Sequence, residues 1–176
     1  FRVKTEPIWG IRAKDKSASG GYQSHDGKNS ASDTGGKLQL IQLPDLKGKR
    51  FLDLGCNEGF FCGEALKQGA SRVVGMDKGR RFISAARELY PEAEFLEQSW
   101  DTLPNEQFDV IIMLSALHYE KQPRELMKRI YDRLAPDGLF VLEYGCVMQS
   151  TQKCWIEVPC GVGVVKYPTL PLLRDH

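Results

Sequence analysis

The chain has 176 residues, of which 41% are hydrophobic and 27% are charged, and its formal net charge is +1. This length and composition suit a single domain with a substantial core. The near-zero charge gives no indication of bulk attraction to nucleic acid or to an acidic membrane, and no stretch approaches the roughly 20 consecutive apolar residues of a membrane-spanning helix.

The N-terminal part of the chain differs in texture from the rest. Residues 10–37 are rich in Gly, Ser, Asp and Lys and carry few apolar anchors, which is typical of a loop. We therefore divide the chain into an arm (1–36), a core (37–146) and a C-terminal segment (147–176). The arm is either a solvated loop, which would include His25, or a lid that excludes water from a site. Tyr22 and Lys37 are the expected lid contacts.

From residue 37 onward, apolar runs alternate with segments of helical spacing. Strands are expected over 50–55, 71–77, 93–98, 108–117 and 138–145, and helices over 59–69, 79–91 and 122–138, the last with an exit turn at 135–138. This alternation predicts an α/β fold with a doubly wound, mostly parallel sheet. Ligands of such sheets bind at the carboxyl ends of the strands.

The last part of the chain fits this pattern less well. Residues 154–158 and 161–168 suit two short strands, and residues 169–176 predict the start of a helix whose remainder is missing from the sequence. We therefore expect the sheet to be incomplete at its C-terminal end, the natural chain to be longer, and a further domain to be possible beyond either end.

The five cysteines are odd in number, and no two have C-x-x-C spacing. This favours neither a disulfide framework nor a zinc site. We expect no metal, a reduced cytoplasmic setting, and thiols that act as small buried apolar groups.

A glycine loop, FLDLGCNEGFF at 51–61, connects the first expected strand to the first expected helix. A dinucleotide pyrophosphate prefers a G-x-G-x-x-G loop at a helix N-terminus. Here Gly55 and Gly59 are four apart, and the carboxylates of Asp53 and Glu58 would repel phosphates. The acids instead favour a guest with cationic groups, such as S-adenosylmethionine, whose own carboxylate can meet helix N–H groups.

Five pieces of the core, in order, resemble the motifs of a class I S-adenosylmethionine-dependent methyltransferase, which has a Rossmann-like fold. They are LDLGCNEG, VVGMD, FLEQSWDTLP, FDVIIMLSALHY and LAPDGLFVLEY. Two positions depart from the family's pattern: Asn57 stands where a glycine is usual, and Ser99 stands where an aspartate is common.

The resemblance implies that the core binds S-adenosylmethionine. Asp53, Gly55 and Gly59 would surround the methionine moiety, and Asn57 would approach it through its backbone. Asp77 would accept hydrogen bonds from the two ribose hydroxyls, which suit a two-oxygen carboxylate. The other implied contacts are Lys78 beside the adenine, Ser99 and Trp100 around the base, and Leu114 at the end of the fourth strand.

Each of these positions also has a purely structural interpretation. The two glycines would serve a tight turn, and Asp77 would cap the helix that follows it. Asn57 and Glu58 would cap the helix that follows them, and Trp100 would pack against the core or its rim.

The resemblance implies methyl transfer by in-line displacement, in which holding donor and acceptor together supplies much of the rate. An oxygen acceptor of high pKa also needs a base. His118, just after the fourth strand, is the first candidate, because an imidazole titrates near neutral pH. Tyr119, Glu143 and Tyr144 are further candidates.

The acceptor is weakly encoded. The loop MLSALHY lacks the Asn-Pro-Pro-Tyr signature of methylation on planar amino groups and resembles the small-molecule and sugar-modifying branch. The segment 147–176 is expected on the acceptor side. Within it, residues 158–176 resemble methyltransferases of bacterial surface polysaccharide biosynthesis, some of which act on a sugar phosphate. Lys166 and Arg174 would receive such an anion or simply be solvated.

We therefore expect O-methylation of a small molecule or saccharide and no nucleic-acid partner. Two alternatives stay open. A methyltransferase of the tRNA wobble base is disfavoured because no basic stripe with interleaved aromatic residues is present. A non-catalytic module that binds S-adenosylmethionine is compatible with the departures at Asn57 and Ser99.

Overall fold

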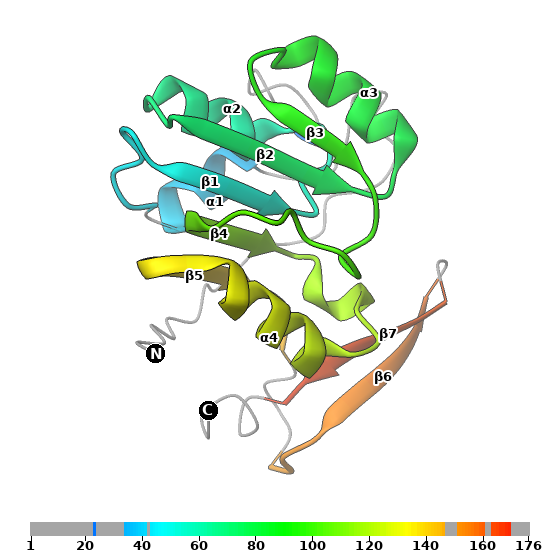
Figure 1. Ribbon diagram of the computed structural model, residues 1–176. Helices are drawn as coiled ribbons and strands as arrows, with labels where there is room; N and C mark the ends of the chain where they lie inside the picture. Colours follow the sequence, from blue (N-terminus) through cyan, green and yellow to red (C-terminus); the bar gives the residue numbers. More distant parts are fainter. Residues whose placement is uncertain (1–22, 24–33, 42, 147–150, 161–162, 170–176) are drawn as a thin grey trace.

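The computed structural model describes residues 23, 34–41, 43–146, 151–160 and 163–169. Figure 1 shows the arrangement of the elements. They are α1 (Thr34–Ile41), β1 (Arg50–Leu54), α2 (Phe60–Lys67), β2 (Arg72–Asp77), α3 (Arg80–Leu89), β3 (Glu94–Glu97), β4 (Phe108–Leu114), the 3₁₀ helix η1 (Leu117–Tyr119), α4 (Pro123–Arg133), β5 (Leu134–Glu143), β6 (Trp155–Cys160) and β7 (Gly163–Pro168).

The first five strands form one sheet in the order β3-β2-β1-β4-β5, and every neighbouring pair is parallel. In this register Asp53 of β1 lies opposite Gly75 of β2 and Ile112 of β4. The direction of strand succession reverses at β1, so the carboxyl ends of β1 and β4 flank a switch point where α/β sheets bind ligands. The predicted doubly wound parallel sheet is confirmed.

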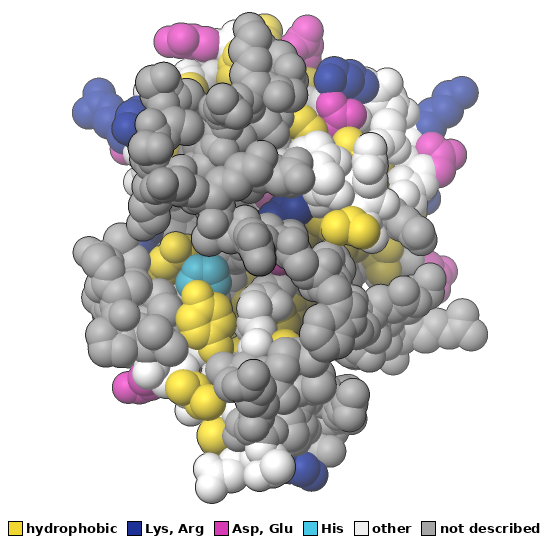
Figure 2. All heavy atoms as spheres, turned by 180° about the vertical axis from the view of Figure 1, so that it is seen from behind, with side chains coloured by type: hydrophobic (Ala, Val, Ile, Leu, Met, Phe, Trp, Pro, Cys, Tyr) yellow, Lys and Arg dark blue, Asp and Glu magenta, His cyan; other side chains and the backbone are white. Residues whose placement is uncertain are grey.

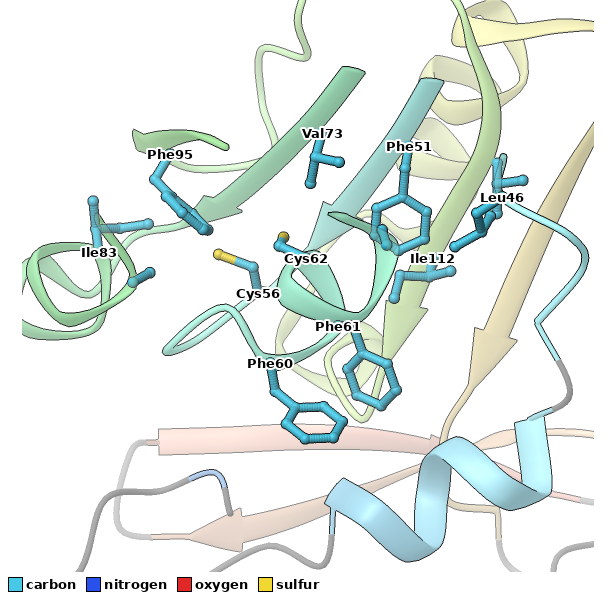
Figure 3. Close-up of a cluster of buried hydrophobic side chains, with 13 residues drawn as sticks. Leu46, Phe51, Cys56, Phe60, Phe61, Cys62, Val73, Ile83, Phe95 and Ile112 are labelled. Atoms are coloured by element: carbon cyan, nitrogen blue, oxygen red, sulfur yellow. The ribbon is translucent and has the colours of Figure 1, made fainter. Parts of the chain in front are cut away.

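The central strands β1, β2 and β4 are largely buried because helices cover both faces of the sheet. On one face, side chains of β1, β2, β3 and β4 pack against α2 and α3, as Phe51 of β1, Ile83 of α3 and Phe95 of β3 show in Figure 3. On the other face, Leu52 and its neighbours pack against α4 through Leu126. The succession of Phe51 and Leu52 on opposite faces is the period of two that a strand imposes.

The end of α4 differs from the expectation. A helix was expected over 122–138, but α4 ends at Arg133 and β5 begins at Leu134. Pairing then jumps from Phe108–Leu134 to Val110–Leu139, so residues 135–138 bulge from the ladder. Pro136 explains the early end, because it disfavours helical geometry in the residue before it and lacks a donor of its own.

The two short strands expected near the C-terminus form the antiparallel hairpin β6–β7, separate from the main sheet. Thr169, which is fully buried, closes its base. Its hydroxyl donates to the Gln152 carbonyl at 2.6 Å, and its N–H donates to the Cys154 carbonyl at 3.0 Å. Within the described ranges, no helix is both long and apolar enough to cross a membrane.

Candidate functional site

The glycine loop leaves β1 and is fastened to β2. The N–H groups of Gly55 and Cys56 both donate to the Met76 carbonyl, at 2.8 and 3.0 Å. Gly55 and Asn57 have φ values of +85° and +53°. This left-handed region costs glycine little, and asparagine is one of the few other residues that visits it routinely. Asn57 therefore keeps the backbone path for which the family usually has a glycine.

The two glycines of the loop face different surroundings. A Cβ on Gly55 would lie 3.0 Å from the Ala116 Cβ and 3.5 Å from Trp100 Cζ2, so β1, β4 and the β3–β4 connection converge there. A Cβ on Gly59, whose φ is +81°, would lie 2.9 Å from Phe95 Cζ. Packing of the loop against β3 therefore suffices to require glycine at position 59.

Asp77, at the end of β2, shapes the same loop. One carboxylate oxygen accepts the Asn57 N–H at 3.1 Å, and the other accepts the Gly79 N–H at 2.8 Å. The N-cap of α3 is Gly79, so Asp77 does not occupy that position. Each carboxylate oxygen has a second lone pair, which suits a hydroxyl donor.

Asp53 lies on β1, the strand next to β2, and its exposed fraction is 2%. Burial raises the pKa of its carboxyl to about 8, the negative charge of Asp77 adds to this, and a hydrogen bond from the Cys62 thiol opposes it. The Cys62 sulfur lies 3.9 Å from Asp53 Oδ2. Near neutral pH the carboxyl is therefore mostly protonated, and a cation beside it would favour the charged form.

Sequence reasoning missed the contact of Gln23 with the loop. Gln23 is 8% exposed. Its N–H donates to Glu58 Oε2 at 3.0 Å, and its Oε1 accepts the Phe60 N–H at 3.1 Å. Gly59, the N-cap of α2, has no side chain that could cap the helix. The Gln23 side chain therefore satisfies the Phe60 N–H in the first turn of α2. The polar composition around Gln23 gave no signal of this burial.

A charged cluster joins α1 to the ends of β4 and β5. Lys37 Nζ donates to Ser115 Oγ at 2.6 Å and to Glu143 Oε2 at 3.2 Å. The Ser115 hydroxyl donates to the same Glu143 oxygen at 2.7 Å. The backbone of Ser115 is left-handed, with a φ of +51°, and its N–H donates to the Glu143 carbonyl at 2.7 Å. Ser115 was not among the predicted site residues.

His118 lies beside this cluster, on η1. Its ring centroid is 4.1 Å from that of Tyr119 and 5.4 Å from that of Tyr167. Half-burial lowers the pKa of the imidazole, Glu143 opposes this, and Lys37 adds to it. Within the described part of the chain, His118 Nδ1 is buried without a hydrogen-bond partner. The back view in Figure 2 shows a histidine, in cyan, beside hydrophobic surface.

Tyr144 differs from His118 as a candidate base. Burial raises the pKa of its phenol to about 12, and Cys146 adds to this. At neutral pH the phenol therefore keeps its proton and is a poor proton acceptor. Tyr119, another candidate, is 50% exposed.

The predicted adenine contacts lie on the other side of the loop. The Ser99 hydroxyl donates to Asp101 Oδ2 at 2.7 Å, so a carboxylate is present two residues beyond the position where the family usually has one. Trp100 is partly buried and packs against the core cluster on the α4 face. Lys78 is exposed and Leu114 is half-buried. Tyr22, His25, Arg174 and the side chain of Lys166 lie outside the described residues.

Comparison with known proteins gives one family. Residues 31–175 match the family described as a methyltransferase domain. The S-adenosylmethionine-dependent methyltransferase of Mesorhizobium loti is similar, with a TM-score of 0.66 and 26% identity, over 80% of this chain and 76% of that one. One from Listeria monocytogenes shares the fold, with a TM-score of 0.66 and 20% identity, over 81% of this chain and 82% of that one.

Curated relatives match over the core. An uncharacterized protein of Haemophilus influenzae is 32% identical over 112 residues, which are 58% of this chain and 44% of that protein. The tRNA U34 carboxymethyltransferase of Alcanivorax borkumensis is 33% identical over 124 residues, which are 66% of this chain and 38% of that protein. The chain thus spans less than half the length of these relatives.

The site fits the cofactor of this family. At Gly55 a side chain would meet both Ala116 and Trp100, so glycine lets these two side chains lie close to the loop backbone. Asp77 keeps lone pairs for the ribose hydroxyls, and Asp53 offers a buried carboxyl that a cation would ionise. The chain is a member of the class I S-adenosylmethionine-dependent methyltransferases, and S-adenosylmethionine is its cofactor.

Proposed function

We propose that this methyltransferase acts on an oxygen of a small-molecule or saccharide acceptor, including a sugar phosphate, with His118 as the base. The observation that carries the proposal is the position of the imidazole, half-buried just after β4 and beside the Lys37–Ser115–Glu143 cluster. When bound, S-adenosylmethionine supplies an electrophilic methyl group on sulfur, so the protein has to position the acceptor and remove its proton.

The residues of the glycine loop would hold the cofactor. Asp53 would pair with the ligand's ammonium, and Asp77 would accept the ribose hydroxyls. Gly55, which has no side chain, would allow the ligand to approach the loop backbone closely, and Asn57 would contribute its backbone. The remaining members of the proposed set are Gly59, Lys78, Ser99, Trp100, Leu114, Tyr22 and Lys37.

The electrostatics around His118 suit a base. Because burial lowers the pKa of the imidazole, the ring is uncharged near neutral pH and can accept a proton. Glu143 favours the charged form. The carboxylate would therefore stabilise the imidazolium that forms when the acceptor hydroxyl gives up its proton. Lys37, held on Glu143 at 3.2 Å, limits that effect and keeps the resting imidazole neutral.

A second acceptor class is supported by the curated relatives. Several are named tRNA U34 carboxymethyltransferase and are 30–33% identical to this chain. The match covers 34% and 38% of the length of two of them, so most of each of those proteins lies outside the aligned region. The net charge of +1 favours the small acceptor, because phosphate-backbone binding relies on clustered Lys and Arg.

The test is a two-step assay. Calorimetry with S-adenosylhomocysteine first establishes binding, and S-adenosylhomocysteine production is then measured with nucleotide sugars, lipid-linked glycans and tRNA as separate acceptors. His118→Gln should lower turnover by about 10²- to 10⁴-fold and leave binding of S-adenosylhomocysteine unchanged. Turnover only on tRNA would overturn the acceptor class, full turnover in the variant would overturn the role of His118, and binding without turnover on any acceptor would favour a non-catalytic module.

A further inference from the structure

We propose that Tyr167, from the C-terminal hairpin, is the positioning residue for His118, so that β7 forms one wall of the methyl-transfer site. The inference rests on the proposed role of His118 as the base. It assigns a function to the hairpin β6–β7, which stands apart from the main sheet at the edge where the strands end (Figure 1).

The first observation is the geometry of the aromatic rings. Tyr167 and His118 have centroids 5.4 Å apart and an interplanar angle of 24°, which is a stacked arrangement. A second described ring next to His118 belongs to Tyr119, its neighbour in the chain, and is tilted by 49°. Tyr119 moves with η1 itself, whereas Tyr167 comes from another element. Tyr167 therefore fixes the imidazole plane relative to the rest of the fold.

The second observation is the space made for the Tyr167 ring. A Cβ on Gly145, just beyond β5, would lie 3.1 Å from Tyr167 Cε1 and 3.3 Å from its Cδ1. Such distances are tighter than ordinary van der Waals contact, so a side chain at 145 would push the ring. The absence of a side chain at Gly145 thus leaves room for the tyrosine ring. Glu143, whose charge raises the pKa of the imidazole, lies two residues earlier, at the end of β5.

The third observation is the anchoring of β7 just beyond the tyrosine. The Thr169 hydroxyl accepts the Cys154 N–H at 3.2 Å and donates to the Gln152 carbonyl at 2.6 Å. Thr169 is fully buried. Because the strand is fixed two residues from Tyr167, the ring is held on His118 by a braced element.

The consequence for the imidazole is a defined orientation and restricted access of water. Among the described residues, the charged groups that act on it are Glu143 of β5 and Lys37 of α1, and the rings of Tyr119 and Tyr167 lie next to it. Removal of the Tyr167 ring would open one face to water. The imidazolium would then be better solvated, and the titration midpoint of the imidazole would rise toward its ordinary value.

The experiment is proton NMR of the histidine ring signals in the full chain saturated with S-adenosylhomocysteine, titrated with pH. The chain has three histidines, and loss of one set of signals in His118→Gln assigns His118. Tyr167→Phe keeps the ring and serves as the matched control, whereas Tyr167→Leu removes it. Gly145→Ala displaces the ring without altering the tyrosine and gives an independent test if Tyr167→Leu does not fold.

In Tyr167→Leu we expect the His118 signals to lose their ring-current shift and their midpoint to rise. Gly145→Ala should move both in the same direction by less, and Tyr167→Phe should change neither. Affinity for S-adenosylhomocysteine should stay within about twofold throughout. Unchanged His118 signals in Tyr167→Leu would overturn the inference. If Tyr167→Leu does not fold, unchanged signals in Gly145→Ala would overturn it instead. A loss of cofactor binding with the His118 signals unchanged would also overturn it. Failure of His118 as the base is read separately, from turnover of His118→Gln.

Discussion

The buried carboxyl of Asp53 should make the stability of the free protein depend on pH in an unusual direction. Its pKa is about 8 in the folded chain against an ordinary 3.8. Between these values the folded state holds a proton that the unfolded state has lost, so the free energy of unfolding should fall as pH rises from about 4 to about 8. The slope from this one group is about 1.4 kcal/mol per pH unit.

Asp53→Asn tests this magnitude, because asparagine is nearly isosteric and does not ionise. Urea unfolding of the free chain at pH 5 and pH 7 should show the wild type losing about 2.7 kcal/mol more than the variant across that interval. All other titrating groups are common to the two proteins and cancel. Equal losses in the two proteins would refute the protonated, buried carboxyl.

Two further perturbations test the loop and the charged cluster. Gly59→Ala should lower the free energy of unfolding by about 1–3 kcal/mol, seen as a lower thermal midpoint, because its new Cβ would meet Phe95 at 2.9 Å with φ at +81°; an unchanged midpoint would contradict the described packing. Lys37→Met should cost about 1–3 kcal/mol in urea unfolding, because it leaves the half-buried Glu143 without its cation. The control Lys67→Met, which removes an exposed i,i+3 pair, should cost less than about 0.5 kcal/mol, and equal costs for the two lysines would contradict the cluster.

The sheet and most of its helices could be predicted because each depends on a short-range pattern. Continuous apolar runs such as 110–114 in β4 identify strands buried on both faces, and the helical spacing in 80–89 gives α3. The carboxyl-end rule then brings together Asp53 and Asp77 without any knowledge of side-chain geometry. The boundary of α4 was missed because the helical pattern of 122–138 runs past Pro136.

The parts of the site that depend on distant contacts could not be predicted. Gln23 lies in a polar stretch, and only its bonds to the glycine loop reveal its burial. The sequence predicts a short strand around Tyr167, but its stacking on His118 follows from how the hairpin folds back onto η1. Ser115 is distinguished by its left-handed backbone and by its hydrogen bonds to Lys37 and Glu143, which the structure alone shows. None of these contacts has a signature in local composition.

The central claim is that carboxylates at the ends of β1 and β2 hold a cationic nucleoside ligand. Calorimetric titration of S-adenosylmethionine into Asp53→Asn and Asp77→Asn tests it most directly. The control is Glu92→Gln, which removes a carboxylate just before β3, at the edge of the sheet where the strands begin. Each of the first two substitutions should weaken binding by about tenfold or more, since hydrogen bonds to a charged group contribute about 1.5–3 kcal/mol, and the control should not. Wild-type affinity in both would contradict the account.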